Sequence, residues 1–187
     1  MAKHKRLSDS IRDGVLGTIE GTGDIANAVI DVVSETAASA IEGTADVTTS
    51  AVEATSEIAE GVIQTVHELG ADLGSSAKGI LLGMLRGTKQ VGSVAFESIA
   101  QTAESVIHAI ARVGGDLGAA AKGLVEGAVQ GAKELGLDAS QAASAAATGA
   151  VKAAYEIGSE SGRKVQDALT GTIAGVKILL KEPFKNK

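Results

Sequence analysis

The sequence predicts an all-α protein: one very long amphipathic helix that assembles with others into a right-handed or nearly straight coiled coil. Three observations predict this fold class. They are an 11-residue pattern, the exclusion of charge from one stripe of that pattern, and the absence of proline before Pro183. A few long helical hairpin segments are the alternative reading.

The pattern consists of five columns, which start at Ile11, Gly14, Val15, Thr18 and Ile19 and continue in steps of eleven residues. These columns hold 78 of the 170 positions from 11 to 180, and none of the 32 charged residues in that window falls in them. Eleven residues over three turns is about 3.67 residues per turn, close to the α-helical value of about 3.6. The columns therefore form one continuous stripe on a helix.

Three segments follow from the pattern in chain order. Residues 1–10 form a basic N-terminal tip, 11–180 the continuous repeat helix, and 181–187 a basic C-terminal tail. Pro183 lies where a helix stop is expected. At 1.5 Å per residue, an unbroken helix over the middle segment would be about 260 Å long.

The charge-free stripe is the expected helix-packing face, because a helix buries its apolar side against a neighbour. An 11-residue repeat favours a right-handed supercoil, and a stripe this wide favours three or more helices. The larger residues of the face are Ile19, Ile30, Ile41, Val52, Ile63, Leu85, Phe96, Ile107, Val129, Val151 and Ile173.

Many of the 24 glycines recur four residues apart, a spacing that lets helix backbones approach closely. The segment 70–91 also resembles 114–135, and glycines recur every 22 residues from Gly70 to Gly158. Turns at 70–74 and 114–115 would cut the chain into hairpins. The unbroken 11-residue phase favours the continuous helix. The expected close-contact residues are Gly79, Gly83, Gly87, Gly123, Gly127, Gly131, Gly171 and Gly175.

No spacing indicates an active site. The chain has no cysteine, and His4, His67 and His108 lie in different columns, so no metal or cofactor is expected. No enzyme activity and no small-molecule substrate are expected either. The net charge is −6, and no Lys or Arg occurs between Asp13 and Ala77, which disfavours nucleic acid as a partner.

The N-terminal residues do not resemble a signal peptide, and no charge-free apolar stretch reaches 18 residues. A cytoplasmic protein is expected, with peripheral association at a membrane as a further option.

The uninterrupted pattern over 11–180 resembles bacterial hendecad coiled-coil proteins. It is also similar to the 11-residue amphipathic helices of synucleins and perilipins, with which the segment 41–49 (IEGTADVTT) shares its Thr, Val, Gly and Ala content. The first resemblance implies self-assembly, and the second implies coating of a lipid surface. Lipid-coating helices carry Lys on both edges of the apolar face, whereas here Lys occupies one edge.

Two functions are therefore expected, and neither is enzymatic. The first is a structural protein that assembles with copies of itself into an oligomeric bundle or filament, with a membrane as a further site of assembly. The alternative is a peripheral helix that coats a membrane, droplet or granule, for which the apolar stripe suits shallow insertion. The acidic first third disfavours an anionic surface.

Overall fold

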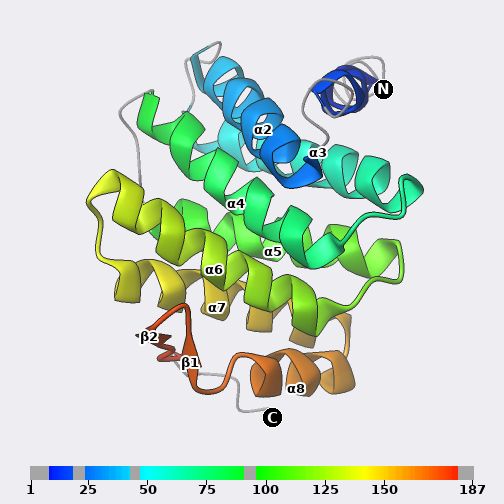
Figure 1. Ribbon diagram of the computed structural model, residues 1–187. Helices are drawn as coiled ribbons and strands as arrows, with labels where there is room; N and C mark the ends of the chain where they lie inside the picture. The colour runs from blue at the N-terminus through cyan, green and yellow to red at the C-terminus, as the bar shows by residue number, and fades with distance from the viewer. Residues whose placement is uncertain (1–8, 19–23, 43–46, 91–95, 181–187) are drawn as a thin grey trace.

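The computed structural model describes residues 9–18, 24–42, 47–90 and 96–180 (Figure 1). In these ranges the chain is all-α apart from one small hairpin, as the fold class predicts. The prediction of one continuous helix is wrong, because the chain forms separate helices that pack against one another. The apolar stripe consequently folds back on itself instead of extending along a coiled coil.

Residues 9–18 form the first described helix. The helices that follow are α2 (Ile25–Glu42), α3 (Val47–Glu68), α4 (Leu73–Gln90), α5 (Phe96–Arg112), α6 (Leu117–Leu135), α7 (Ala139–Ile157) and α8 (Ser159–Ala168). The strands β1 (Thr172–Ile173) and β2 (Val176–Lys177) form an antiparallel pair.

The helices stack in two layers, as Figure 1 shows. We call α2, α4, α6 and α8 the front layer and α3, α5 and α7 the back layer. Each helix packs on the next one in its own layer and on its sequence neighbour in the other layer. Pairs of antiparallel helices stacked in this way form a short α-solenoid.

Three described turns share one design, a left-handed glycine followed two residues later by aspartate. Gly70, Gly114 and Gly136 have φ values of 66°, 71° and 72°, which L side chains rarely adopt. The residue after each glycine donates its N–H to a carbonyl five residues back, which closes the end of the helix. Asp72, Asp116 and Asp138 then accept backbone N–H groups at the start of the next helix.

The length of the repeating unit explains why the phase suggested a continuous helix. One helix plus its turn spans 22 residues, as the glycine spacing shows, and 22 is twice eleven. A turn therefore interrupts the helix without shifting the columns. The 44-residue similarity marks a whole hairpin of two helices. The alternative of hairpins with turns at 70–74 and 114–115 describes these two sites correctly.

The C-terminal hairpin also departs from the predicted helix. Ala174 (φ 50°) and Gly175 (φ 79°) form the two-residue turn between the paired residues Ile173 and Val176. Gly171 also has a positive φ, 111°, and both glycines are exposed. Gly171 and Gly175 thus serve an extended hairpin rather than close helix contacts, because helical φ values are negative.

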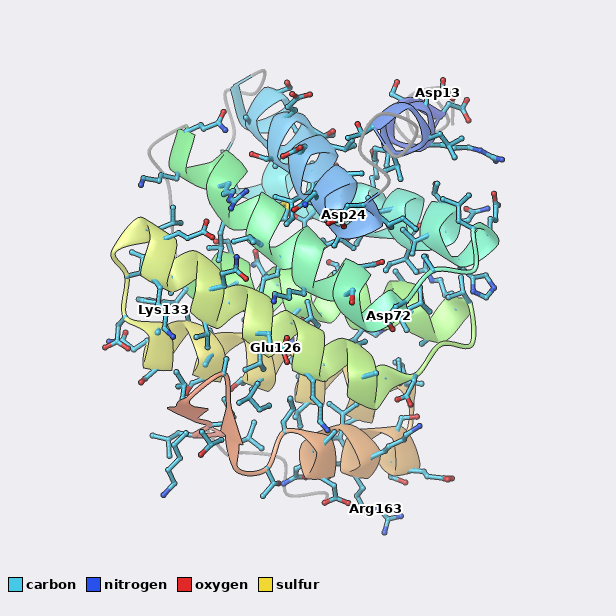
Figure 2. The ribbon with its side chains drawn as sticks, viewed as in Figure 1. Asp13, Asp24, Asp72, Glu126, Lys133 and Arg163 are labelled. Carbon is cyan, nitrogen blue, oxygen red and sulfur yellow. The ribbon has the colours of Figure 1, made fainter. Side chains whose placement is uncertain are left out.

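The core lies between the two layers and consists largely of Ala, Val, Ile and Leu. Figure 2 shows charged side chains projecting from the outside of the stack, among them Glu126 and Lys133 of α6 and Arg163 of α8. Among the described residues, no helix combines the length and the apolar character needed to cross a bilayer.

Candidate functional site: the glycine-lined helix contacts

The described residues of the predicted packing face lie inside the folded chain. The side chains of Ile63, Leu85, Ile107, Val129 and Val151 are at most 2% exposed. A second group of the predicted residues is half-buried, namely Ile30, Phe96 and Ile173. Ile19 lies outside the described residues, and so do the side chains of Ile41 and Val52. The partner of each described buried residue is another helix of the same chain.

The glycines of α4 bring its backbone against α2. A Cβ placed on Gly83 would lie 2.7 Å from the carbonyl oxygen of Ile30, and one on Gly87 would lie 2.7 Å from that of Ser34. Gly79 is less tightly packed, with 3.1 Å to the nearest α2 side-chain carbon. Real Cβ contacts do not reach 2.7 Å, so only glycine fits at Gly83 and Gly87 without displacement of a backbone.

The glycines of α6 repeat this contact against α4. A Cβ on Gly123 would collide with the carbonyl oxygen of Gly74, and one on Gly127 would lie 2.6 Å from that of Lys78. A Cβ on Gly131 would lie 2.5 Å from a leucine methyl group of α4. Each of these two front-layer helices thus turns a row of three glycines towards the helix before it. The repetition makes this contact the characteristic feature of the fold.

The back layer has one comparable close contact. Gly149 of α7 lies against Ala100 of α5, whose carbonyl oxygen a Cβ on Gly149 would meet. The pairs Lys78–Gly127 and Ala100–Gly149 both join residues 49 apart, five more than the 44-residue repeat. Each hairpin is therefore displaced by little more than one helical turn relative to the hairpin before it.

Ion pairs on the surface follow nearly the same register, because they join residues 48 apart in successive hairpins. These pairs are Lys78–Glu126 (3.8 Å), Arg86–Glu134 (2.9 Å), Glu104–Lys152 (3.0 Å), His108–Glu156 (3.1 Å) and Asp116–Lys164 (3.5 Å). Exposed pairs contribute little stability each, about 0–1 kcal/mol. Their constant spacing favours one alignment of the stacked helices over a shift by one turn.

Two of these pairs alter the pKa of a partner. The hydrogen bond that Lys152 donates to Glu104 raises the pKa of Lys152 above its usual value. The hydrogen bond from Gln130, followed by that from Arg86, lowers the pKa of Glu134. Both shifts favour the charged forms and therefore the ion pairs.

Between α3 and α5 lies a shallow polar groove with a volume of about 260 Å³. Glu60 and Arg112 form an ion pair there, and the hydroxyl oxygens of Ser56 and Ser105 lie 3.1 Å apart. His108 also lines the groove and pairs with Glu156 of α7. These side chains bind one another across the helices, which makes the groove an interhelical contact.

The histidines do not meet in the described part of the chain. His67 is exposed near the end of α3, His108 pairs with a glutamate on α7, and His4 lies outside the described residues. No group of three or more metal-binding side chains occurs among the described residues.

Three large apolar residues remain on the surface of the described chain. They are Leu69 at 45% exposed, Ile157 at 41% and Leu179 at 62%. All three belong to the column of Gly14, so they lie on the charge-free stripe. Leu69 and Ile157 each directly precede a glycine at the end of a back-layer helix. The stripe is therefore exposed where the chain leaves its helices.

Sequence reasoning missed the turn residues, although signals for them existed. Glycines 22 residues apart, each followed two residues later by an acidic or capping residue, mark helix ends at Gly70, Gly114 and Gly136. The pairing of Gly with Asp distinguishes these glycines from the ones that line helix contacts, which no aspartate follows at that spacing.

No protein-family model matches the sequence, and no curated protein matches it. One similar solved structure is the crystal structure of a de novo designed helical repeat protein, DHR7. Its sequence is 15% identical, the match covers 85% of this chain and 96% of that chain, and the TM-score is 0.46. This likeness is too distant to carry an argument, so the fold assignment rests on the helices and contacts described above.

Proposed function

We propose that this protein is a non-enzymatic structural protein that assembles with copies of itself through its glycine- and alanine-rich helix faces. The observation that carries the proposal is the repeated contact in which α6 lies on α4 as α4 lies on α2. The chemistry of such a contact is the same when the second helix belongs to another copy. Every hairpin that presents this face suits a hairpin of another molecule.

The outer surfaces of the end helices favour a small closed oligomer over a filament. Polar outer faces on terminal repeats oppose further stacking. Both ends of the front layer are polar, because α2 exposes Asn27, Asp31, Glu35 and Ser39, and α8 exposes Glu160, Arg163, Lys164 and Asp167. We therefore expect a defined number of copies rather than an open series.

Sedimentation velocity of the full chain, from low to high micromolar concentration, tests this proposal. We expect species heavier than the 18.6 kDa chain whose fraction grows with concentration, together with an unchanged helical circular dichroism spectrum. High salt should leave most of the oligomer intact, because apolar contacts are not screened. A single 18.6 kDa species at every concentration would contradict self-assembly.

Coating of a lipid surface is the second candidate, and the exposed stripe residues Leu69, Ile157 and Leu179 favour it. Apolar side chains at helix ends offer a first point of insertion, after which the rest of the stripe can follow. Flotation with neutral phosphatidylcholine vesicles tests this function. Binding that Leu69→Ser plus Ile157→Ser reduces supports a lipid coat, and a protein that stays in the aqueous fraction contradicts it.

A further inference from the structure

The turn between α6 and α7 is held by few interactions. Three residues, 136–138, separate the two helices. The N–H of Gly136 lies 3.4 Å from the carbonyl oxygen of Lys133, and Asp138 accepts N–H groups of Ser140 and Gln141 at 2.8 and 2.9 Å. A Cβ on Gly136 would meet nothing within 4 Å.

The corresponding turn between α5 and α6 is more firmly embedded. A Cβ on Gly115 would lie 2.5 Å from a methyl group of Leu73 and 2.6 Å from one of Ile110. Asp116 of that turn also pairs with Lys164 of α8 at 3.5 Å. No such contact is recorded for Asp138. Of these two turns, the one between α6 and α7 has less tertiary structure to lose when it opens.

Opening this turn into helix would keep the apolar stripe continuous. Leu135, Gly136, Ala139 and Ser140 occupy charge-free columns, whereas Asp138 lies outside them. A helix running from the start of α6 to the end of α7 would be roughly 60 Å long and would bury the same side throughout. In an ordinary hairpin the two apolar faces would point in unrelated directions after such straightening.

The contacts that α7 makes with α5 are suited to a second copy. They comprise the close approach of Gly149 to Ala100 and the ion pair of Lys152 with Glu104. If two chains exchange α7, α8 and the hairpin, each contact forms again between the chains. Reciprocal exchange changes only the turn and whatever new contact the two straightened helices make.

We infer that two copies of this chain form a dimer by exchanging residues 139–180, with the turn at Gly136–Asp138 straightened into one helix. This inference rests on the proposed self-assembly and specifies its mode. The partner is a second copy because the glycine rows require a helix backbone against them, which a lipid surface does not supply. The dimer has twofold symmetry, since each copy gives and receives the same segment.

Two opposed changes in the turn test the inference by sedimentation. Gly136→Ala plus Asp138→Ala removes the left-handed glycine and the helix cap, both of which favour the turn over helix. We expect the dimerisation constant to rise at least tenfold. Ala139→Pro does the reverse, because proline is accepted at the first position of α7 but not inside a continuous helix.

The triple variant combines both changes and should return to monomer with native helicity. If the triple variant dimerises as strongly as the double variant, the turn is not the hinge and the inference is wrong. Urea unfolding of each variant, monitored by circular dichroism, confirms that the variants being compared are folded.

Cross-linking identifies the exchanged segment. The chain has no cysteine, so Glu104→Cys and Lys152→Cys are made in separate copies, which are mixed and treated with a short bis-maleimide. Exchange predicts a cross-link between chains, strengthened by the double turn variant and abolished by Ala139→Pro. The matched control is Ser56→Cys with Ser105→Cys, which lie on α3 and α5 before the hinge and should not cross-link between chains.

The outcomes separate the inference from the proposed function. Oligomers that form without the Glu104–Lys152 cross-link and are insensitive to Ala139→Pro overturn the exchange while self-assembly stands. A monomer in every variant overturns both.

Discussion

The two layers of the stack reach close packing in opposite ways. In the front layer, α4 and α6 each place three glycines against the backbone of the preceding helix, whereas α5 in the back layer contains no glycine. The back layer is filled instead by branched side chains such as Ile99, Ile107 and Ile110, each at most 1% exposed. One layer is therefore sensitive to added atoms and the other to removed atoms.

The largest effect is expected from adding a side chain to the front layer. Gly127→Leu should leave the chain unfolded without denaturant, because the Cβ alone would lie 2.6 Å from the carbonyl oxygen of Lys78. Circular dichroism and thermal unfolding measure this. Gly17→Leu is the matched control, since a Cβ at exposed Gly17 meets nothing within 4 Å and should be tolerated. Equal stability of the two variants would contradict the close contact.

Removal of atoms from the back layer should have the next largest effect. Ile107→Ala leaves a cavity beside fully buried neighbours and should lower the free energy of unfolding by about 2–5 kcal/mol. Ile107→Val, which removes one methylene group, should cost about 0.5–1.5 kcal/mol. Urea denaturation gives both values. If Ile107→Ala is as mild as Ile107→Val, the back layer is not tightly filled.

The aspartate caps predict a loss of stability in acid. Hydrogen bonds involving Ser75 lower the pKa of Asp72, and the backbone N–H of Ala119 is the main cause of the lowered pKa of Asp116. A lowered folded-state pKa means that the caps stabilise above the unfolded value of about 3.9. This stabilisation is lost as the pH falls through the folded values.

Urea unfolding between pH 7 and pH 2 tests this expectation. Each cap contributes about 1 kcal/mol. Asp72→Asn plus Asp116→Asn should retain most of the stability at pH 7 and lose less of it in acid, because asparagine caps a helix without titrating. Identical pH profiles for the variant and the natural sequence would exclude these caps as the cause.

The smallest effect concerns the ion pairs that connect the hairpins. Lys152→Met should lower the free energy of unfolding by less than about 1 kcal/mol, since both partners are partly exposed. The difference should shrink in high salt. Lys133→Met, at an exposed lysine on α6 whose ion-pair partner is not described, is the comparison. A salt-independent loss in Lys152→Met would indicate packing by the aliphatic stem instead.

Much of the secondary structure could be predicted because a helix buries one side. The charge-free columns placed Ile63, Ile107 and Val151 on an apolar face, and the structure buries all three. The columns carry no information on where a helix ends, however. With a unit of 22 residues, a turn at Gly114 leaves every later residue in the same column, so a continuous helix and a stack of hairpins have one pattern.

The partner of each helix face could not be predicted from periodicity either. Four-residue glycine spacing indicates close helix contact but is silent on which helix is the neighbour. Gly83 lies against a helix 53 residues earlier and Gly127 against one 49 residues earlier, distances that depend on the lengths of the intervening turns and helices. At Gly171 and Gly175 the same spacing occurs in a hairpin, where positive φ values are the reason for glycine.

The displacement of each hairpin by about one turn has a consequence for the size of the protein. Every internal hairpin sees the same neighbours before and after it, so the chain has no intrinsic length. Duplication or deletion of one 44-residue segment would yield a longer or shorter member that keeps the first helices and the terminal hairpin as its two boundaries. Genetic change in whole units is therefore the route by which such a protein can vary its reach.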